Sequence, residues 1–158
     1  MRKSKSFDLG PERSIGFLIR DTHREAAKIL ADRIQPAGIS LGMWYFLRAL
    51  WEQDGLTQRE LSRRIGMMEP TTVNALAAME RAGLIARRRD KGDKRRRLVF
   101  LTRKGAALKD EMLPVAARVN ELAVAGLTAE EVDRLRQLLA RVKSNLQRER
   151  QNSTNGGT

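Results

Sequence analysis

The 158-residue sequence contains no cysteine, which excludes disulfides, thiolate zinc sites and thiol redox switches. Aromatic residues make up only 4% of the chain, and this scarcity favours helices packed through aliphatic side chains over a β-sandwich. No apolar run approaches the ~18 residues that a membrane span requires. The basic N-terminus is followed by Asp8 and Glu12 without an apolar segment between, so we expect no signal peptide and a cytoplasmic location.

The residue patterns of enzyme active sites are absent as well. A single His cannot supply a His-based metal cluster, and the chain has no phosphate-cradling Gly-rich loop, no Gly-x-Ser-x-Gly and no His-Glu-x-x-His. The paired acids Glu130 and Glu131 fall at a predicted helix start, where carboxylates favour the helix dipole. We therefore expect a protein that is not an enzyme and that carries no metal and no cofactor.

Positive charge is what the sequence has in excess. Lys and Arg number 31 against 19 Asp and Glu, which gives a net charge of +12. Such a balance indicates a polyanionic partner, whether DNA, RNA or an anionic membrane; a solvated basic face without a partner is the alternative. Residues 54–105 hold fourteen Lys or Arg and six acids, so eight of the twelve net positive charges lie in this third of the chain.

Apolar residues at helical spacing predict a mainly α-helical chain. A single domain is expected over residues 11–150, between a flexible basic arm (1–10) and a flexible polar tail (151–158). Pro114 is expected to bend one long helix. The apolar stripe of the final helix indicates either a partner chain or a core within the chain. The helices outside the central region are expected over residues 11–34, 41–51, 103–125 and 129–150.

Two short helices are predicted in the central region. Thr57 and Glu60 have the spacing of a capping box, in which each side chain satisfies a free backbone amide at a helix start. This helix ends at Gly66, and a second one begins near Pro70, which the first helical turn tolerates. The second helix is expected to turn three apolar side chains inward: Val73, Leu76 and Met79. Short helices joined by a tight glycine-containing turn are typical of a helix-turn-helix, although a scaffold hairpin is an alternative.

A β-hairpin is predicted directly after this pair of helices. Residues 84–89 and 95–101 have strand character, and residues 90–94 form the turn between them. Eight cations and two acids lie in residues 87–97, and such self-repulsion is costly unless a polyanion relieves it. The predicted fold is therefore mainly α with a small β-hairpin wing (α+β): a winged helix-turn-helix with a helical dimerisation region.

The sequence resembles the MarR family of bacterial transcription regulators. Three segments carry the resemblance, in order: Leu56–Leu61 (LTQREL), Glu80–Ile85 (ERAGLI) and Asp93–Gly105 (DKRRRLVFLTRKG). The resemblance implies a homodimer formed by about residues 11–36 and 103–150, with DNA bound by about residues 54–102. It implies a sequence-specific regulator of double-stranded DNA that reads a pseudo-palindromic operator and acts as a repressor. A non-specific nucleoid-associated or RNA-binding winged-helix protein is the alternative.

Candidate DNA contacts lie in the second short helix and in the hairpin. Short side chains at the helix start can approach base edges, and Asn can bond an adenine edge twice; helix capping is the alternative. Many family members carry Arg where this chain has Asn74, which leaves its base preference open. The candidate base contacts are Pro70, Thr71, Thr72 and Asn74.

In the hairpin, Arg95 is the candidate for the minor groove, where a narrow groove attracts Arg. The resemblance implies that Asp93 orients the Arg95 guanidinium through an ion pair; Asp93 as a turn former is the alternative. Phosphate contacts are assigned to Arg88, Arg89, Lys94 and Arg96, to which Arg59, Arg63 and Arg64 would add.

The resemblance also implies release from DNA by a small aromatic acid or its thioester. Cations together with aromatic rings suit such a ligand, although Trp44 and Tyr45 are equally compatible with a core. The lack of cysteine excludes the thiol-sensing variant of the family. The candidate effector-binding residues are Arg20, His23, Arg24, Trp44, Tyr45 and Arg48.

Overall fold

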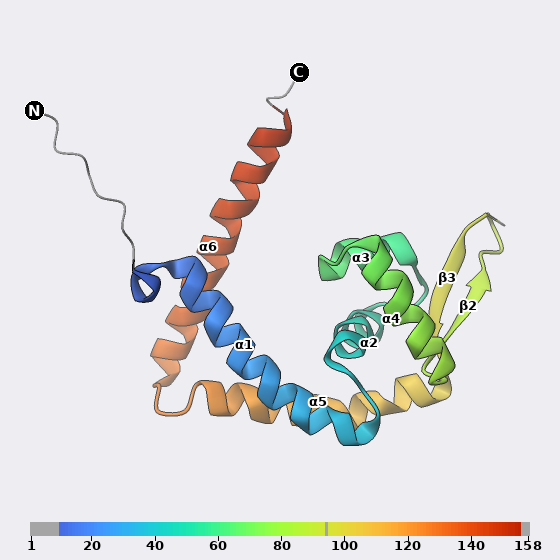
Figure 1. Cartoon of the computed structure of the whole chain (residues 1–158), viewed down its shortest axis with the longest axis horizontal. Helices are drawn as coiled ribbons and strands as arrows, with labels where there is room; N and C mark the ends of the chain where they lie inside the picture. The colour runs from blue at the N-terminus through green and yellow to red at the C-terminus, as the bar shows by residue number, and fades with distance from the viewer. Residues whose placement is uncertain (1–9, 94, 156–158) are drawn as a thin grey trace, which may run out of the picture. The chain divides into compact units, whose positions relative to one another are not determined.

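The computed structural model describes residues 10–93 and 95–155 (Figure 1). The chain forms two compact units, residues 1–120 and 121–158. In these described ranges the structure is mostly helical, with one small antiparallel sheet, as predicted. The basic arm expected over residues 1–10 lies, except for Gly10, outside the described residues.

The first unit opens with two capped helices. A 3-10 turn, η1 (Pro11–Arg13), precedes α1 (Ile15–Ile34), because the Ser14 hydroxyl accepts a hydrogen bond from the Phe17 amide and caps the helix there. The single helix expected from Pro11 is thus interrupted at Ser14. A second 3-10 turn, η2 (Gln35–Ala37), leads to α2 (Leu41–Glu52), which Ser40 caps in the same way.

The central helices follow their predicted boundaries closely. Helix α3 (Gln58–Ile65) starts with the expected capping box and ends at Gly66, whose φ of 72° suits glycine. Helix α4 (Glu69–Arg81) carries Pro70 in its first turn and is followed by Gly83, also at positive φ.

The hairpin consists of β2 (Ile85–Arg89) and β3 (Arg97–Leu101), paired from Ile85–Leu101 to Arg89–Arg97. A third strand, β1 (Leu56–Thr57), pairs with the other edge of β3 and was not predicted. It has only two residues, and one of them also caps α3, so the capping pattern concealed it. This short strand ties the hairpin to the start of α3.

The hydrophobic core joins the helices of the first unit to the base of the hairpin. Its members are buried apolar side chains from α1, α2, α3, α4, the sheet and α5 (Arg103–Ala123). Gly105 packs so closely on β2 that an added Cβ would lie 2.1 Å from the Leu84 carbonyl oxygen. The Trp51 indole N–H donates to the Gly105 carbonyl at 2.9 Å. The start of α5 is therefore fixed between α2 and the root of the hairpin.

The second unit consists mainly of α6 (Ala129–Asn155). Thr128 and Glu131 form the predicted capping box at its start. The helix continues to Asn155, so residues 151–155 are helical where a flexible tail was expected; residues 156–158 lie outside the described residues. No helix in the described part of the chain is both long and apolar enough to cross a membrane.

Candidate nucleic-acid interface

The turn between α3 and α4 is held by side chains that bond to its backbone. The Ser62 hydroxyl donates to the Met67 carbonyl at 2.6 Å. The Thr72 hydroxyl and the Thr72 amide both donate to the Met68 carbonyl, at 3.2 and 3.1 Å. Thr72 is fully buried. Its predicted role as a base contact is therefore wrong: its hydroxyl is used inside the fold to fix the first turn of α4.

The other predicted base contacts in α4 are available to a partner. Pro70, Thr71 and Asn74 are exposed at the N-terminal half of the helix. Val73 is 41% exposed and not inward as predicted, while Leu76 and Met79 are fully buried as predicted. The error lies in the helical phase, because a buried Thr occupies the inward position that the apolar pattern assigned to its neighbour.

The hairpin tip is shaped by two aspartates. The Asp90 carboxylate accepts from the Gly92 amide at 2.8 Å, and the Asp93 carboxylate accepts from the Arg95 amide at 2.9 Å. Among the described residues, no ion pair joins Asp93 to the Arg95 guanidinium. The turn-forming alternative for Asp93 is the one observed, and the ion-pair expectation is wrong for this state of the protein.

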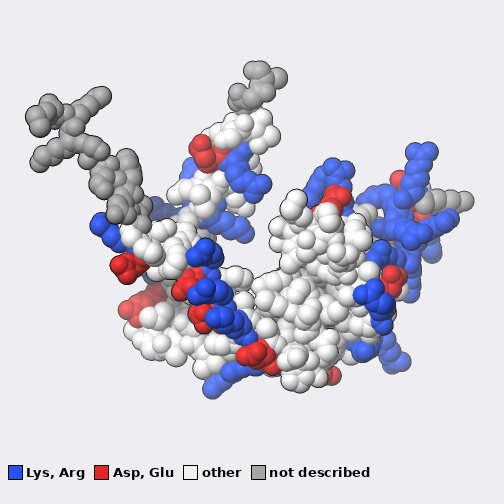
Figure 2. All heavy atoms as spheres, viewed as in Figure 1, with Lys and Arg blue, Asp and Glu red and all other residues white. Residues whose placement is uncertain are grey.

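The predicted phosphate contacts differ in how free they are. Arg88, Arg89 and Arg95 are exposed, and the Arg88 guanidinium lies 5.5 Å from the centre of the Phe100 ring. Arg96 is within 3.3 Å of the Glu60 carboxylate. Lys94, the remaining predicted contact of the hairpin, lies outside the described residues. Lys and Arg side chains gather over the β2–β3 hairpin in Figure 2.

A groove of about 830 Å³ runs between the start of α3, the start of α4 and the beginning of β3. Five arginines line it, against Glu60 and Glu69. Arg97 was not predicted, although it lies in the same basic run; Arg64, which was, instead pairs with Glu52 at 3.1 Å. The lining arginines are Arg59, Arg63, Arg95, Arg96 and Arg97.

Glu60 connects the two sides of this groove. One carboxylate oxygen accepts from the Thr57 amide and hydroxyl, both at 2.7 Å, and the other faces Arg96. The hydrogen bonds from Thr57, together with the nearby Arg96 and Arg63 charges, lower the pKa of Glu60. Glu60 therefore stays ionised at neutral pH and holds Arg96 toward α3.

A separate cavity of about 380 Å³ lies between α1, α2 and α5 in the first unit. Four predicted effector-binding residues line it: His23, Trp44, Tyr45 and Arg48. The Arg48 guanidinium lies 5.8 Å from the centre of the Trp44 ring, and the Tyr45 hydroxyl lies 3.4 Å from His23 Nε2. Burial raises the pKa of Tyr45, so its hydroxyl remains neutral at physiological pH.

Arg20 and Arg24, the other two predicted effector residues, do not line this cavity. Arg24 pairs with Asp21 and Glu25, and the Arg20 guanidinium lies 5.1 Å from the centre of the Phe17 ring. At about 100° per residue, the α1 face that contains His23 turns Arg24 away from α2.

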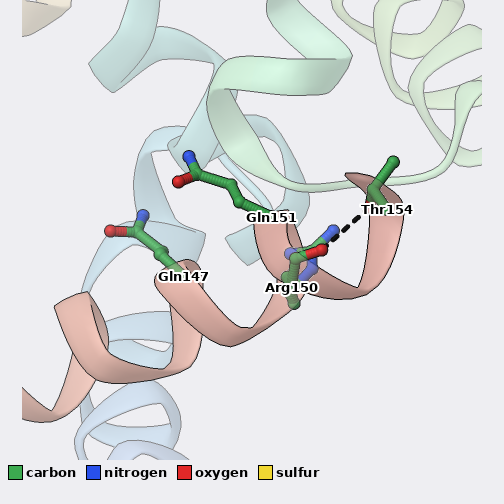
Figure 3. A pocket seen from close by; sticks show the side chains of 4 residues that line it. All are labelled: Gln147, Arg150, Gln151 and Thr154. Atoms are coloured by element: carbon green, nitrogen blue, oxygen red, sulfur yellow. Dashed lines mark hydrogen bonds between the residues drawn. The ribbon is translucent and has the colours of Figure 1, made fainter. Parts of the chain in front are cut away.

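Two further surface features carry no site chemistry. A depression near the end of α6 is lined by Gln147, Arg150, Gln151 and Thr154 (Figure 3). All four belong to one exposed helix, and the Thr154 hydroxyl donates to the Arg150 carbonyl within that helix. Among residues 10–93 and 95–155, no three His, Asp or Glu side chains are grouped to hold a metal ion.

Helix α3, the tight turn, helix α4 and the β2–β3 hairpin define a winged helix-turn-helix, a class of DNA-binding domain. Residues 39–96 match the model of the MarR family. The transcriptional regulator HosA of Escherichia coli is 33% identical over 96 residues, which cover 61% of this chain and 71% of HosA. The chain belongs to the MarR family, whose members are DNA-binding transcription regulators.

Solved structures agree with this assignment. A probable transcriptional regulator from Pseudomonas aeruginosa shares 34% identity and a TM-score of 0.75, over 83% of this chain and 98% of that chain. MepR of Staphylococcus aureus, solved in complex with DNA, shares 26% identity and a TM-score of 0.77, over 84% of this chain and 98% of MepR.

Proposed function

We propose that this protein is a homodimeric, sequence-specific regulator that binds double-stranded DNA in the cytoplasm and represses transcription. The observation that carries the proposal is the placement of five arginines in one groove beside the exposed start of α4. Arginine contacts to phosphates supply affinity and fix the register on the duplex, whereas side chains of the inserted helix read bases. Both are provided by one compact unit.

Exposed apolar side chains support the homodimer. They lie on α1 and on α6, and none of the described residues of α6 is buried within the chain. A second copy would cover such surfaces. In a two-fold dimer the two α4 helices would read half-sites about 34 Å apart, which calls for a pseudo-palindromic operator. These exposed side chains include Ile15, Leu18, Ile19, Ile29, Leu135, Leu138, Leu139 and Leu146.

Two measurements test this proposal. Footprinting on the DNA that flanks the chain's own gene should reveal one protected pseudo-palindrome. Equal, salt-dependent affinity for every duplex would instead support the non-specific alternative. Sedimentation at micromolar concentration should give a dimer, and a species of 17.9 kDa alone would contradict it.

We further propose that a small aromatic acid, or its thioester, releases the protein from DNA through the α1–α2–α5 cavity. Arg48 offers a cation and Trp44 and Tyr45 offer rings at this cavity. A ligand shifts DNA binding only by its different affinity for the two dimer conformations. Since α2 packs on α3 and α4 through the common core, filling the cavity has a physical route to the DNA-binding helices.

A screen of benzoate-type acids and their thioesters, by calorimetry and gel shift, tests this second proposal. Arg48→Ala and Trp44→Phe should weaken binding and release, and a reporter behind the footprinted promoter should rise when the ligand is added. Arg24→Ala is the matched control, because it removes an arginine of α1 that does not line the cavity. Release that is unchanged in both cavity variants would exclude this cavity.

A further inference from the structure

Exposed large hydrophobic side chains fall into two groups among the described residues. One group lies on α1 and from Leu122 onward, on the surfaces proposed for the dimer. Within residues 54–102 the group has two members, Met68 and Val73, with exposed fractions of 78% and 41%. Both lie at the N-terminal end of α4, which is the end that enters the major groove in a helix-turn-helix. Their exposure therefore has a different explanation from that of the dimer surfaces.

The structure aims Val73 outward and restricts its motion. With Leu76 and Met79 fully buried, a turn of about 100° per residue places Val73 and Thr71 on either side of the outward Asn74. A β-branched side chain in a helix has one preferred χ1 rotamer, so Val73 loses little freedom when it meets a partner.

The position of Met68 is fixed through its backbone. It is the N-cap of α4, and its carbonyl accepts the two hydrogen bonds from the buried Thr72. The long, adaptable Met side chain therefore starts from a defined point at the tip of the helix. Thr72, which makes no contact with DNA itself, positions this apolar side chain.

Helix α4 carries no cation before Arg81, its last residue. It therefore cannot make the common contact of Arg or Lys with guanine from its N-terminal half. The thymine 5-methyl is the apolar group that base pairs present in the major groove. We propose that Val73 and Met68 contact thymine methyl groups in each operator half-site, and that these thymines determine specificity. This inference rests on the proposed DNA-binding function.

The test uses full-length protein and a duplex enriched from a pool of randomised DNA by repeated binding. Each thymine of that duplex is replaced in turn by deoxyuridine, which removes one methyl group and leaves base pairing intact. Wild-type affinity should fall about fourfold for each buried methyl and about fifteenfold when both half-sites are changed. Positions outside the footprint should have no effect.

Variants then assign the contacted methyl groups to residues. Val73→Ala should bind the thymine duplex more weakly and lose its response to deoxyuridine at one position per half-site; Met68→Ala should do the same at another position. Thr71→Ala, on the opposite flank of Asn74, is the matched control and should keep the full response. Alanine has the highest helix propensity, so the variants should keep the wild-type melting temperature.

Three outcomes separate the possibilities. If no sequence is enriched, the proposed sequence-specific function fails, and this inference fails with it. If a sequence is enriched but deoxyuridine has no effect at any thymine, the methyl contacts are excluded and the regulator function stands. If the deoxyuridine response persists in both Val73→Ala and Met68→Ala, the assignment to these two residues is overturned.

Discussion

The β2–β3 hairpin and the start of α4 are both exposed in the same unit, and their chemistry is opposite. Residues 87–97 of the hairpin region contain eight Lys or Arg, whereas α4 has no cation before Arg81. Cations on the hairpin attract the phosphates of any sequence, while short, amide and apolar side chains can distinguish base edges. The difference indicates a division in which the hairpin supplies affinity and α4 supplies specificity.

The strongest test of this division is Arg95→Ala at the hairpin tip. We expect affinity for the enriched duplex to fall about 10- to 100-fold, because a charged hydrogen bond contributes about 1.5–3 kcal/mol. The melting temperature should hardly change, since the side chain is exposed. Titration at fixed physiological salt measures the effect.

Arg95→Lys separates charge from shape at this position. It keeps the cation but loses the planar guanidinium, so an intermediate affinity is expected. Wild-type affinity in Arg95→Ala would show that the hairpin tip does not contact DNA and would remove one half of the comparison.

Asn74→Ala tests the other half. If Asn74 reads a base edge, its loss should weaken binding to the enriched duplex by about 1–3 kcal/mol, that is, by about tenfold. Affinity for a scrambled duplex should stay the same, because the helix keeps its surroundings. An equal loss on both duplexes would instead assign Asn74 to the phosphate backbone.

Much of the fold can be predicted from the sequence because its helix boundaries are marked locally. Thr57 with Glu60 and Thr128 with Glu131 form the expected capping boxes, and Gly66 ends α3 as expected. Strand β1 could not be predicted, because its two residues pair with a segment 41 residues later, and short non-local pairing leaves no pattern in sequence.

The candidate site was predicted less completely than the fold. Basic residues of the hairpin could be identified from composition alone, whereas Thr72 and Val73 were exchanged between inside and outside. A buried Thr is satisfied by a hydrogen bond to a backbone carbonyl four residues earlier, and hydrophobicity cannot show such a partner. Arg24 was assigned to the effector cavity by charge, but its acidic neighbours and its place on α1 decide otherwise.

A smaller effect is expected for Arg88→Ala on the hairpin strand. As a phosphate contact, Arg88 should contribute equally on every sequence, so affinity should fall a few-fold on enriched and scrambled duplexes alike. The slope of log affinity against log salt should decrease by about 0.9 for one lost phosphate contact per half-site. Arg24→Ala, whose arginine is already paired with two acids of α1, should leave the slope unchanged. A sequence-dependent loss in Arg88→Ala would contradict the assignment of affinity alone to the hairpin.

The smallest effect concerns Glu60, the acid that lies between the hairpin and α3. Glu60→Gln removes the charge that faces Arg96 and weakens the acceptor of the capping box. Loss of such a cap should lower the free energy of unfolding by about 1 kcal/mol or less at pH 7. Arg96 would then be free for phosphate, so affinity should rise about two- to threefold on all duplexes, because one acid is removed near the polyanion.

The pH dependence of stability checks the role of Glu60 in the fold. Hydrogen bonds from Thr57 lower the folded-state pKa of Glu60 below its ordinary value of 4.5. Its carboxylate therefore stabilises the fold above that value, and this contribution is lost as the pH falls through the folded-state pKa. The stability difference between wild type and Glu60→Gln should accordingly be full at pH 7 and vanish in acid. Asp110→Asn removes the same charge from exposed α5 and should change neither stability nor affinity. Weaker DNA binding by Glu60→Gln would mean that Glu60 positions Arg96 for DNA, and the hairpin would then depend on α3 for its affinity.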